Sequence, residues 1–211
     1  MLSFPVVTIA VIVINVFVFM LELAGGDPFI AQWSLVPANI SAGRDWITVL
    51  TAMFMHSSWL SFLGNLVFLW AFGPQIEDLL GPVPYLIFYL LSGMTVAFAQ
   101  VLLAPLSQTS NLGASGAIAA VMGAFLITYP NDRIRTWMPS FSHSRVTLIP
   151  AIFLVSIWLL TQAFSQLGSI TSVTVSTGGA AYMAHIGGFL FGLAAVRLFE
   201  TADRRLQHGL G

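Results

Sequence analysis

The sequence predicts an all-α integral membrane protein, a bundle of six transmembrane helices that forms one domain over residues 1–211. Hydrophobic residues make up 57% of the chain and charged residues only 7%, whereas about a quarter of the residues in soluble domains are charged. Each helical crossing of a bilayer takes about 20 residues, so the chain suffices for about six crossings with short loops. The net charge of −1 argues against nucleic acid as a partner.

The first three spans are predicted in the N-terminal half, where long uncharged runs end at proline, glycine or acidic residues. No charge and no basic leader precede Glu22, so the first run is predicted to be a retained span rather than a cleaved signal peptide. Residues 22–45 are too polar to cross a membrane but contain tryptophan, phenylalanine and leucine, which favours a first loop lying in the interface. The three spans cover residues 4–21, 59–76 and 84–103.

The C-terminal half adds three more spans, of which the fourth, residues 115–129, is the shortest. At 1.5 Å per residue it reaches only about 22 Å, less than the roughly 30 Å hydrocarbon core. Its first residue is therefore expected below the membrane surface, with the preceding loop packed in protein or lining a wet cavity. The fifth and sixth spans are predicted at residues 147–167 and 180–199, with a short cytoplasmic tail at about 200–211.

Arginine placement predicts the orientation, because cytoplasmic loops hold the excess of basic residues. All seven basic residues are arginines, and only Arg44 lies on the other side. Six spans with both termini in the cytoplasm satisfy this distribution. The N-terminal ends of the fourth and sixth spans then face the non-cytoplasmic side, which places Ser115 and His185 at similar depth. The cytoplasmic arginines are Arg133, Arg135, Arg145, Arg197, Arg204 and Arg205.

Ser115 and His185 are the candidate catalytic residues. Ser115 is flanked by glycine and alanine, which leave its hydroxyl accessible, at the start of an apolar span. A histidine inside a span is costly and is functional by default. A neutral imidazole can take the serine proton so that the oxygen attacks a carbonyl. The backbone N–H of Ser115, at a helix start, would then stabilise the oxyanion that forms.

Gly188 and Gly192 follow His185 in the sixth span. They are four residues apart, which puts both on one face of the helix. Small residues at such a spacing let two membrane helices approach closely. We therefore predict that they pack the sixth span against the fourth and bring base to nucleophile.

Other hydrolytic chemistries lack their residues. The chain has no cysteine, no aspartate pair within spans and no His-Glu-x-x-His motif, so no metal site and no cofactor are predicted. No carboxylate occurs between Arg133 and Phe199. The sequence therefore predicts a Ser-His dyad without a third, acidic member.

Four motifs together resemble the rhomboid family of intramembrane serine proteases. They are residues 113–117 (GASGA), 184–188 (AHIGG), 53–56 (MFMH) leading to Gly64-Asn65, and 129–135 (YPNDRIR). The resemblance covers nearly the whole chain. It implies a six-helix protease that cleaves substrate transmembrane helices near small residues, with Ser115 as nucleophile, His185 as base and the Asn65 side chain on the oxyanion. It also implies that residues 22–45 form a membrane-embedded loop and residues 168–179 a cap over the site.

Three positions depart from the family pattern. Ser61 stands where the family usually has a histidine that faces the oxyanion, so any oxyanion role of Ser61 would act through water. Trp46 is followed by Ile47 rather than by arginine, and Arg44 lies two residues earlier. Ala119 replaces a tyrosine that often stacks on the catalytic histidine.

The sequence leaves two alternatives open. One is a non-catalytic rhomboid-like protein that binds membrane clients, and the other is a small transporter or channel with Ser, His and Asn along a polar path. The protease hypothesis predicts transmembrane-helix proteins and membrane lipids as partners, with a monomer sufficient for activity. The absence of a transit-like leader favours the plasma (inner) membrane of a bacterium, with the active site toward the non-cytoplasmic face.

Overall fold

The structure, a computed structural model, describes residues 3–138, 145–160 and 178–200. Within the helices and strands, side chains are described for residues 3–134, 147–160 and 185–200. Residues 161–167 of the predicted fifth span, most of the predicted cap at 168–179 and all but the first residue of the tail at 200–211 lie outside the described residues. The elements in chain order are α1 (Val6–Trp33), α2 (Pro37–Ser41), α3 (Thr48–Thr51), η1 (Ala52–Phe54), α4 (Trp59–Leu80), α5 (Pro82–Leu103), α6 (Ser115–Thr128), β1 (Arg133–Met138), β2 (Arg145–Pro150), the helix Ala151–Leu160 and α8 (Gly178–Phe199).

The fold is mainly helical, as the sequence predicts. Three helices, α1, α4 and α5, are long and apolar enough to cross a membrane, and the described residues contain three shorter apolar helices at α6, Ala151–Leu160 and within α8. Large apolar side chains on the outer faces of the long helices are exposed, among them Phe17, Val67 and Trp70 at 62%, 64% and 57%. Such faces suit a hydrocarbon solvent rather than water.

The first helix runs further than predicted. Glu22 does not end α1, which continues to a kink at Gly26, where φ is 58°, and after the kink to Trp33. The Glu22 side chain is buried, and the cost of burying its carboxyl group is offset because an oxygen of that group accepts the backbone N–H of His56, at 3.0 Å. Residues 22–45 are therefore partly helical.

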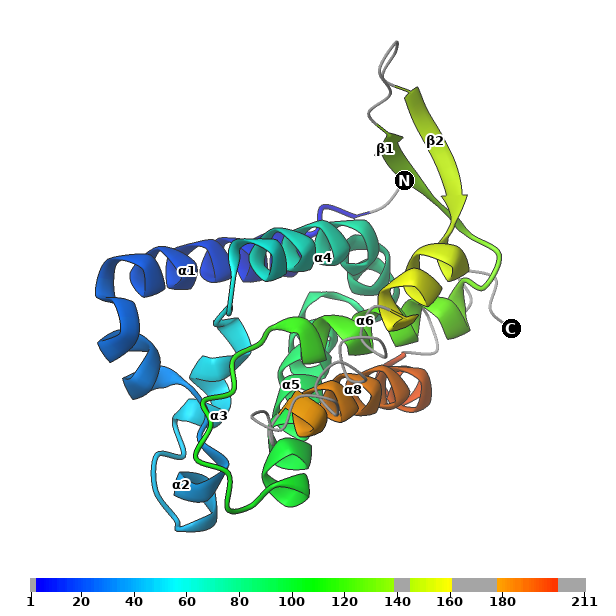
Figure 1. Cartoon of the computed structure of the whole chain (residues 1–211). Helices are drawn as coiled ribbons and strands as arrows, with labels where there is room; N and C mark the ends of the chain where they lie inside the picture. The colour runs from blue at the N-terminus through cyan, green and yellow to red at the C-terminus, as the bar shows by residue number, and fades with distance from the viewer. Residues whose placement is uncertain (1–2, 139–144, 161–177, 201–211) are drawn as a thin grey trace.

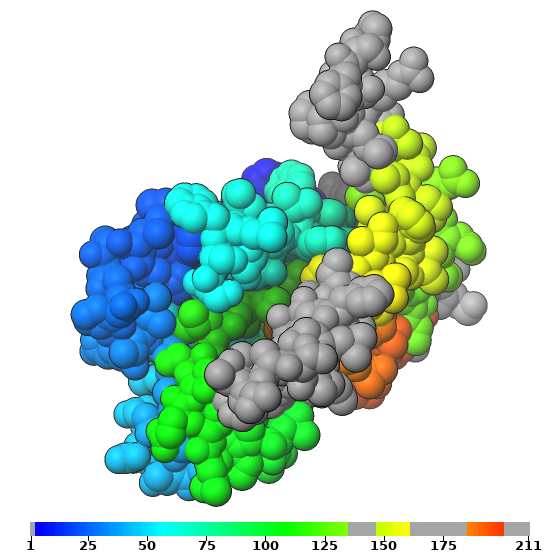
Figure 2. All heavy atoms as spheres, viewed as in Figure 1, coloured from blue at the N-terminus to red at the C-terminus, as the bar shows by residue number. Residues whose placement is uncertain are grey.

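The helix α6 lies at the centre of the bundle. It packs against α4, α5 and most extensively α8, and every residue from Gly116 to Phe125 is buried. Figure 1 shows α1 beside α4, and α8 beside α6 and α5. In the space-filling view, α1 (blue) lies at one side of the visible face, and Ala151–Leu160 (yellow) and α8 (orange) lie at the other (Figure 2).

The carboxylate of Glu77, near the end of α4, caps the start of α1. It accepts the backbone N–H groups of Val7 and Thr8 at 2.8 and 2.7 Å, and also the Thr8 hydroxyl at 2.7 Å. The first N–H groups of a helix have no partner within the helix, and a negative charge suits this end of the helix dipole. Since Glu77 is only 1% exposed, the contact fixes α1 to α4 inside the protein.

Replacing Glu77 by alanine is expected to lower the free energy of unfolding by about 2 kcal/mol, because buried donors lose their acceptor. Glu77→Gln should lose less, since its carbonyl oxygen still accepts. Asp27→Ala, which removes an exposed carboxylate from the far end of α1, beyond the Gly26 kink, is the control. Thermal unfolding in detergent measures the effect, and equal losses for Glu77→Ala and Asp27→Ala would contradict this role for Glu77.

The described residues between α6 and Ala151–Leu160 form two antiparallel β-strands, the β1–β2 hairpin, which the predicted helical bundle did not include. Strands β1 and β2 pair from Arg133 opposite Pro150 to Met138 opposite Arg145. The predicted fifth span begins at residue 147, but residues 147–150 belong to β2 and the helix begins at Ala151. The cause is local, because β1 and β2 are rich in the β-branched residues that favour strands.

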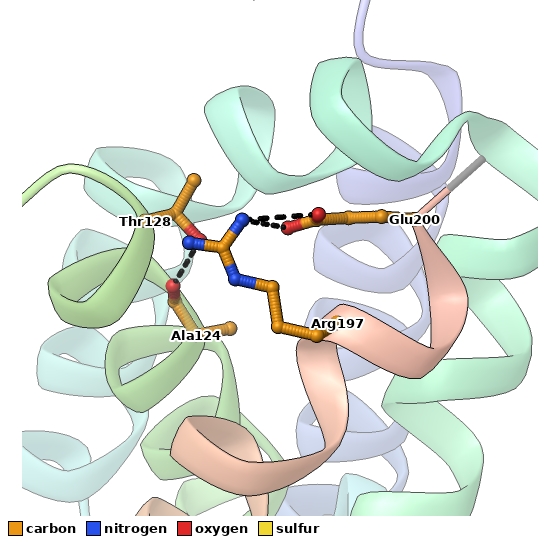
Figure 3. Close-up of polar contacts among 4 residues, drawn as sticks. All are labelled: Ala124, Thr128, Arg197 and Glu200. Atoms are coloured by element: carbon orange, nitrogen blue, oxygen red, sulfur yellow. Dashed lines mark hydrogen bonds and ion pairs between the residues drawn. The ribbon is translucent and has the colours of Figure 1, made fainter. Parts of the chain in front are cut away.

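The C-terminal ends of α4, α6 and α8 lie at the same end of the bundle. Asp78, Asp132 and Glu200 all lie close enough to Tyr129 to act on its hydroxyl electrostatically. At the end of α8, Arg197 forms an ion pair with Glu200 at 3.1 Å, beside the last turn of α6 (Figure 3). A cation in the last turn of α8 also complements the helix dipole.

Candidate active site

Ser115 is the first residue of α6, and the segment before it is held by the N-terminal part of the chain. The N–H of Gly113 donates to the carbonyl oxygen of Ala52 at 2.9 Å, and Leu35 and Asn111 exchange two backbone hydrogen bonds of 3.1 and 2.8 Å. Gly113 has φ of +157°, and a Cβ there would lie 3.0 Å from the Ser115 hydroxyl oxygen. The loop is therefore packed in protein, and glycine leaves room for the serine hydroxyl.

The structure brings Ser115 and His185 together. The Ser115 Oγ atom lies 2.8 Å from Nε2 of His185, across 70 residues of sequence. This distance is within the range of a hydrogen bond between a nucleophile and a general base. Both side chains are partly buried. Ser115 begins α6 and His185 lies in the N-terminal half of α8, whereas Arg197 and Glu200 lie at the other end of α8.

Small residues allow α6 and α8 to pack backbone against backbone next to this pair. A Cβ on Gly188 would lie 2.4 Å from the carbonyl oxygen of Gly116, and a Cβ on Gly192 would lie 1.9 Å from that of Ala120. On the facing helix, a Cβ on Gly123 would lie 2.2 Å from the carbonyl oxygen of Phe189. Because atoms do not approach so closely, any larger residue must push the helices apart.

Trp158 is a neighbour of His185 that sequence analysis missed. Its ring centroid lies 6.2 Å from that of His185 with the planes inclined by 38°, and the side chain is buried. Ala119, where the family pattern has a tyrosine, is fully buried in α6. The aromatic neighbour of the histidine thus comes from Ala151–Leu160 instead. Its sequence signal is one tryptophan in an apolar run, which also fits ordinary packing.

Asn65 and Ser61 lie four residues apart on α4, and hence on one side of the helix. Asn65 is only 6% exposed, and its Nδ2 has no hydrogen-bond partner among the described residues. The backbone N–H of Ser61 donates to the capping Ser58 hydroxyl. In the described part of the chain, no hydrogen bond joins Asn65 or Ser61 to Ser115 or His185.

His56 lies outside this constellation. It is buried just before α4, where its ring contacts Phe19 and Phe62 edge-on at 5.9 and 5.2 Å. Burial lowers the pKa of His56 to about 4, which keeps its ring neutral at physiological pH. Neither ring nitrogen has a partner among the described residues. These contacts indicate packing at the start of α4.

A small cavity lies next to the loop that leads to Ser115. Its volume is about 20 Å³, enough for roughly one water molecule. Polar side chains of Gln100 and Asn111 line it, together with apolar residues of α3, η1 and α5 and with Gly113. It provides room for water on the nucleophile's side of the bundle.

The chain is similar in sequence to known rhomboid proteins. The Rhomboid domain profile matches residues 43–200, about three quarters of the chain. Rhomboid protease GlpG of Yersinia pestis (strain Pestoides F) is 27% identical over 187 residues, which cover 88% of this chain and 60% of that protein. Rhomboid protease GluP of Bacillus subtilis (strain 168) is 28% identical over 118 residues, 54% of this chain and 23% of that protein. The chain thus spans 60% or less of the length of these relatives.

Proposed function

The chain belongs to the rhomboid family, and from this premise we propose that it is an intramembrane serine endopeptidase. The observation that carries the proposal is the 2.8 Å contact between Ser115 Oγ and His185 Nε2. A family match alone does not distinguish an enzyme from a non-catalytic relative, but a serine paired with a histidine inside a set of apolar helices is the chemistry of acyl transfer.

In the proposed reaction the Ser115 hydroxyl donates its proton to Nε2 of His185 while its oxygen attacks a peptide carbonyl. The tetrahedral intermediate collapses when His185 gives the proton to the departing amine, which leaves the substrate's acyl group on Ser115. A water molecule then loses a proton to His185 and attacks the ester, and Ser115 recovers its proton as the acid product leaves.

Two donors are proposed for the oxyanion. The first is the backbone N–H of Ser115, which has no partner within α6 because it lies in the first turn and which adds the positive end of the helix dipole. The second is the Nδ2 group of Asn65, a buried donor without a partner among the described residues. A buried amide left unpaired suits a group that waits for a substrate atom. Ser61 would contribute only through water.

The proposed substrates are membrane proteins whose transmembrane helix unwinds near small residues. A stable helix engages its carbonyl groups in hydrogen bonds, so only extended backbone can reach Ser115. Membership of the rhomboid family, together with the long apolar helices, identifies the chain as an integral membrane protein. We propose a bacterial plasma membrane, six spans, cytoplasmic termini and an active site toward the non-cytoplasmic face, with a monomer sufficient and no cofactor required.

The test is incubation of the purified protein in detergent with a single-span substrate, followed by mass spectrometry of the products. Cleavage at a discrete bond in or near the span, together with fluorophosphonate labelling that maps to Ser115, would support the proposal. Asn65→Ala should slow cleavage about 100-fold, as the loss of one oxyanion donor does in other enzymes. Labelling at another residue would reject Ser115. A protein that binds the substrate but cleaves nothing would favour the non-catalytic alternative.

Trp158 is expected to hold the His185 ring in its productive orientation. Trp158→Leu should lower kcat roughly tenfold with little change in KM, whereas Trp158→Phe, which keeps an aromatic face, should retain most of the activity. Trp70→Leu on the exposed face of α4 is the matched control. Kinetics over a range of pH measure the effect. Equal losses for the Leu and Phe variants would show that the ring contact with His185 is not what matters.

A further inference from the structure

The β1–β2 hairpin is fixed at its base and leaves the bundle from there. The N–H of Ala151 donates to the carbonyl oxygen of Asp132 at 2.9 Å, and Ile134 belongs to the core at 9% exposed. In Figure 1 the strands run across the direction of α4 and α6 and extend past the edge of the helices. If these helices cross the membrane, the strands run along the membrane plane, over lipid rather than away from it.

The hairpin is basic and apolar. Residues 133–150 contain three arginines and no aspartate or glutamate. Arg133 is exposed and has no ion-pair partner among the described residues. Leu148 is 52% exposed, and Trp137 lies in the facing strand. Arginine and tryptophan together are typical of segments at the boundary between membrane and water.

A two-stranded sheet of this kind needs a covering surface. Isolated hairpins are marginally stable in water, and three strands or a packing partner are generally required. Here the sheet has two strands, and within the described residues its core contact is at Ile134, near the base. The choice of partner follows from the charge, because basic residues beside a membrane are attracted to the negative headgroups of anionic lipids.

We propose that the β1–β2 hairpin binds the headgroups of anionic phospholipids in the leaflet nearest to the C-terminal ends of α4 and α6. Its three arginines supply the positive charge that attracts the lipid phosphates, and the exposed Leu148 lies at the level of the upper acyl chains. The sites are distinct from Ser115 and His185 and do not depend on the proposed proteolysis.

Lipid binding in micelles tests the proposal. Phosphatidylglycerol or phosphatidylcholine is titrated into the purified protein, and native mass spectrometry counts the retained lipids. The parent should prefer phosphatidylglycerol. Each arginine is expected to contribute about fivefold, so replacement of Arg133, Arg135 and Arg145 by glutamine should weaken binding on the order of 100-fold. The triple lysine variant should keep most of it. The single variants Arg133→Gln and Arg44→Gln each remove one positive charge, from opposite ends of the helix bundle. Only Arg133→Gln should weaken lipid binding.

Depth measurement locates the hairpin directly. The chain has no cysteine, so Leu148→Cys provides a unique thiol for a spin label on the otherwise unchanged protein. In bilayers with phosphatidylglycerol, the label should report headgroup or upper acyl depth. This arm remains decisive if the triple glutamine variant fails to fold.

Several results would overturn the proposal. They are unchanged phosphatidylglycerol binding by a folded triple glutamine variant, equal affinity for phosphatidylcholine, and a label at residue 148 that reports bulk water. Displacement of the lipid by an equal concentration of inorganic phosphate would assign a free-phosphate site instead. Cleavage of the single-span substrate by a variant that no longer binds the lipid would leave the protease proposal intact.

Discussion

Alanine at Ser115 is expected to slow cleavage of a single-span substrate by a factor on the order of 10⁴ to 10⁶, because no other group at this position can form the acyl-enzyme. His185→Ala should cost about as much, and the double variant should be no slower than either single variant. Residues that act as one unit show this failure of additivity. Initial rates in detergent and in liposomes provide the measurement.

The matched control is Ser110→Ala, which removes an exposed serine five residues before the candidate nucleophile. It should cleave at the parental rate. Two outcomes contradict the dyad. One is residual cleavage by Ser115→Ala at a rate near that of the parent. The other is a double variant whose loss equals the product of the single losses, which would mean that the two side chains act independently.

Valine at Gly192 is expected to separate α6 from α8 and to remove both stability and activity. A Cβ at this position would lie 1.9 Å from the carbonyl oxygen of Ala120, a backbone atom that cannot rotate away. Overpacking of this kind costs about 3 kcal/mol. Displacing His185 from Ser115 by about 1 Å should lower the rate by at least about 100-fold. Thermal unfolding and fluorophosphonate labelling measure the two effects.

Gly187→Ala, on the same helix, is the control, since a Cβ at Gly187 meets no described atom within 4 Å. It should leave activity unchanged and stabilise α8 by about 0.5–1 kcal/mol, because alanine favours the helix over glycine. If Gly192→Val were as stable and as reactive as Gly187→Ala, close packing of α6 on α8 would not be what holds the serine next to the histidine.

The helical fold and the candidate pair could be predicted from the sequence because both depend on local signals. Apolar runs fixed the approximate limits of α4, α5 and α6, and the small residues around Ser115 and after His185 indicated where two helices could meet. The 2.8 Å contact is what this reasoning anticipated, whereas the catalytic role of the pair stays a prediction.

Other features depend on contacts between distant segments, which periodicity does not reveal. The first helix passes Glu22 because the His56 backbone satisfies the carboxylate, 34 residues away. Trp158 reaches His185 only through the packing of Ala151–Leu160. The hairpin is hard to predict for a different reason: Arg133, Arg135 and Arg145 fit a cytoplasmic loop equally well, and the few β-branched residues near them are a weak signal for strands.

The enclosure of α6 bears on how the protein would respond to membranes of different thickness. Lipid contacts the outer helices. These helices can tilt, or the bilayer around them can become locally thinner or thicker, at a modest energetic cost. The 14-residue helix that begins with Ser115 is shielded on all sides by protein from Gly116 to Phe125. Changes in acyl-chain length should therefore be absorbed at the periphery, while the depth of the nucleophile is set by its neighbours and stays constant.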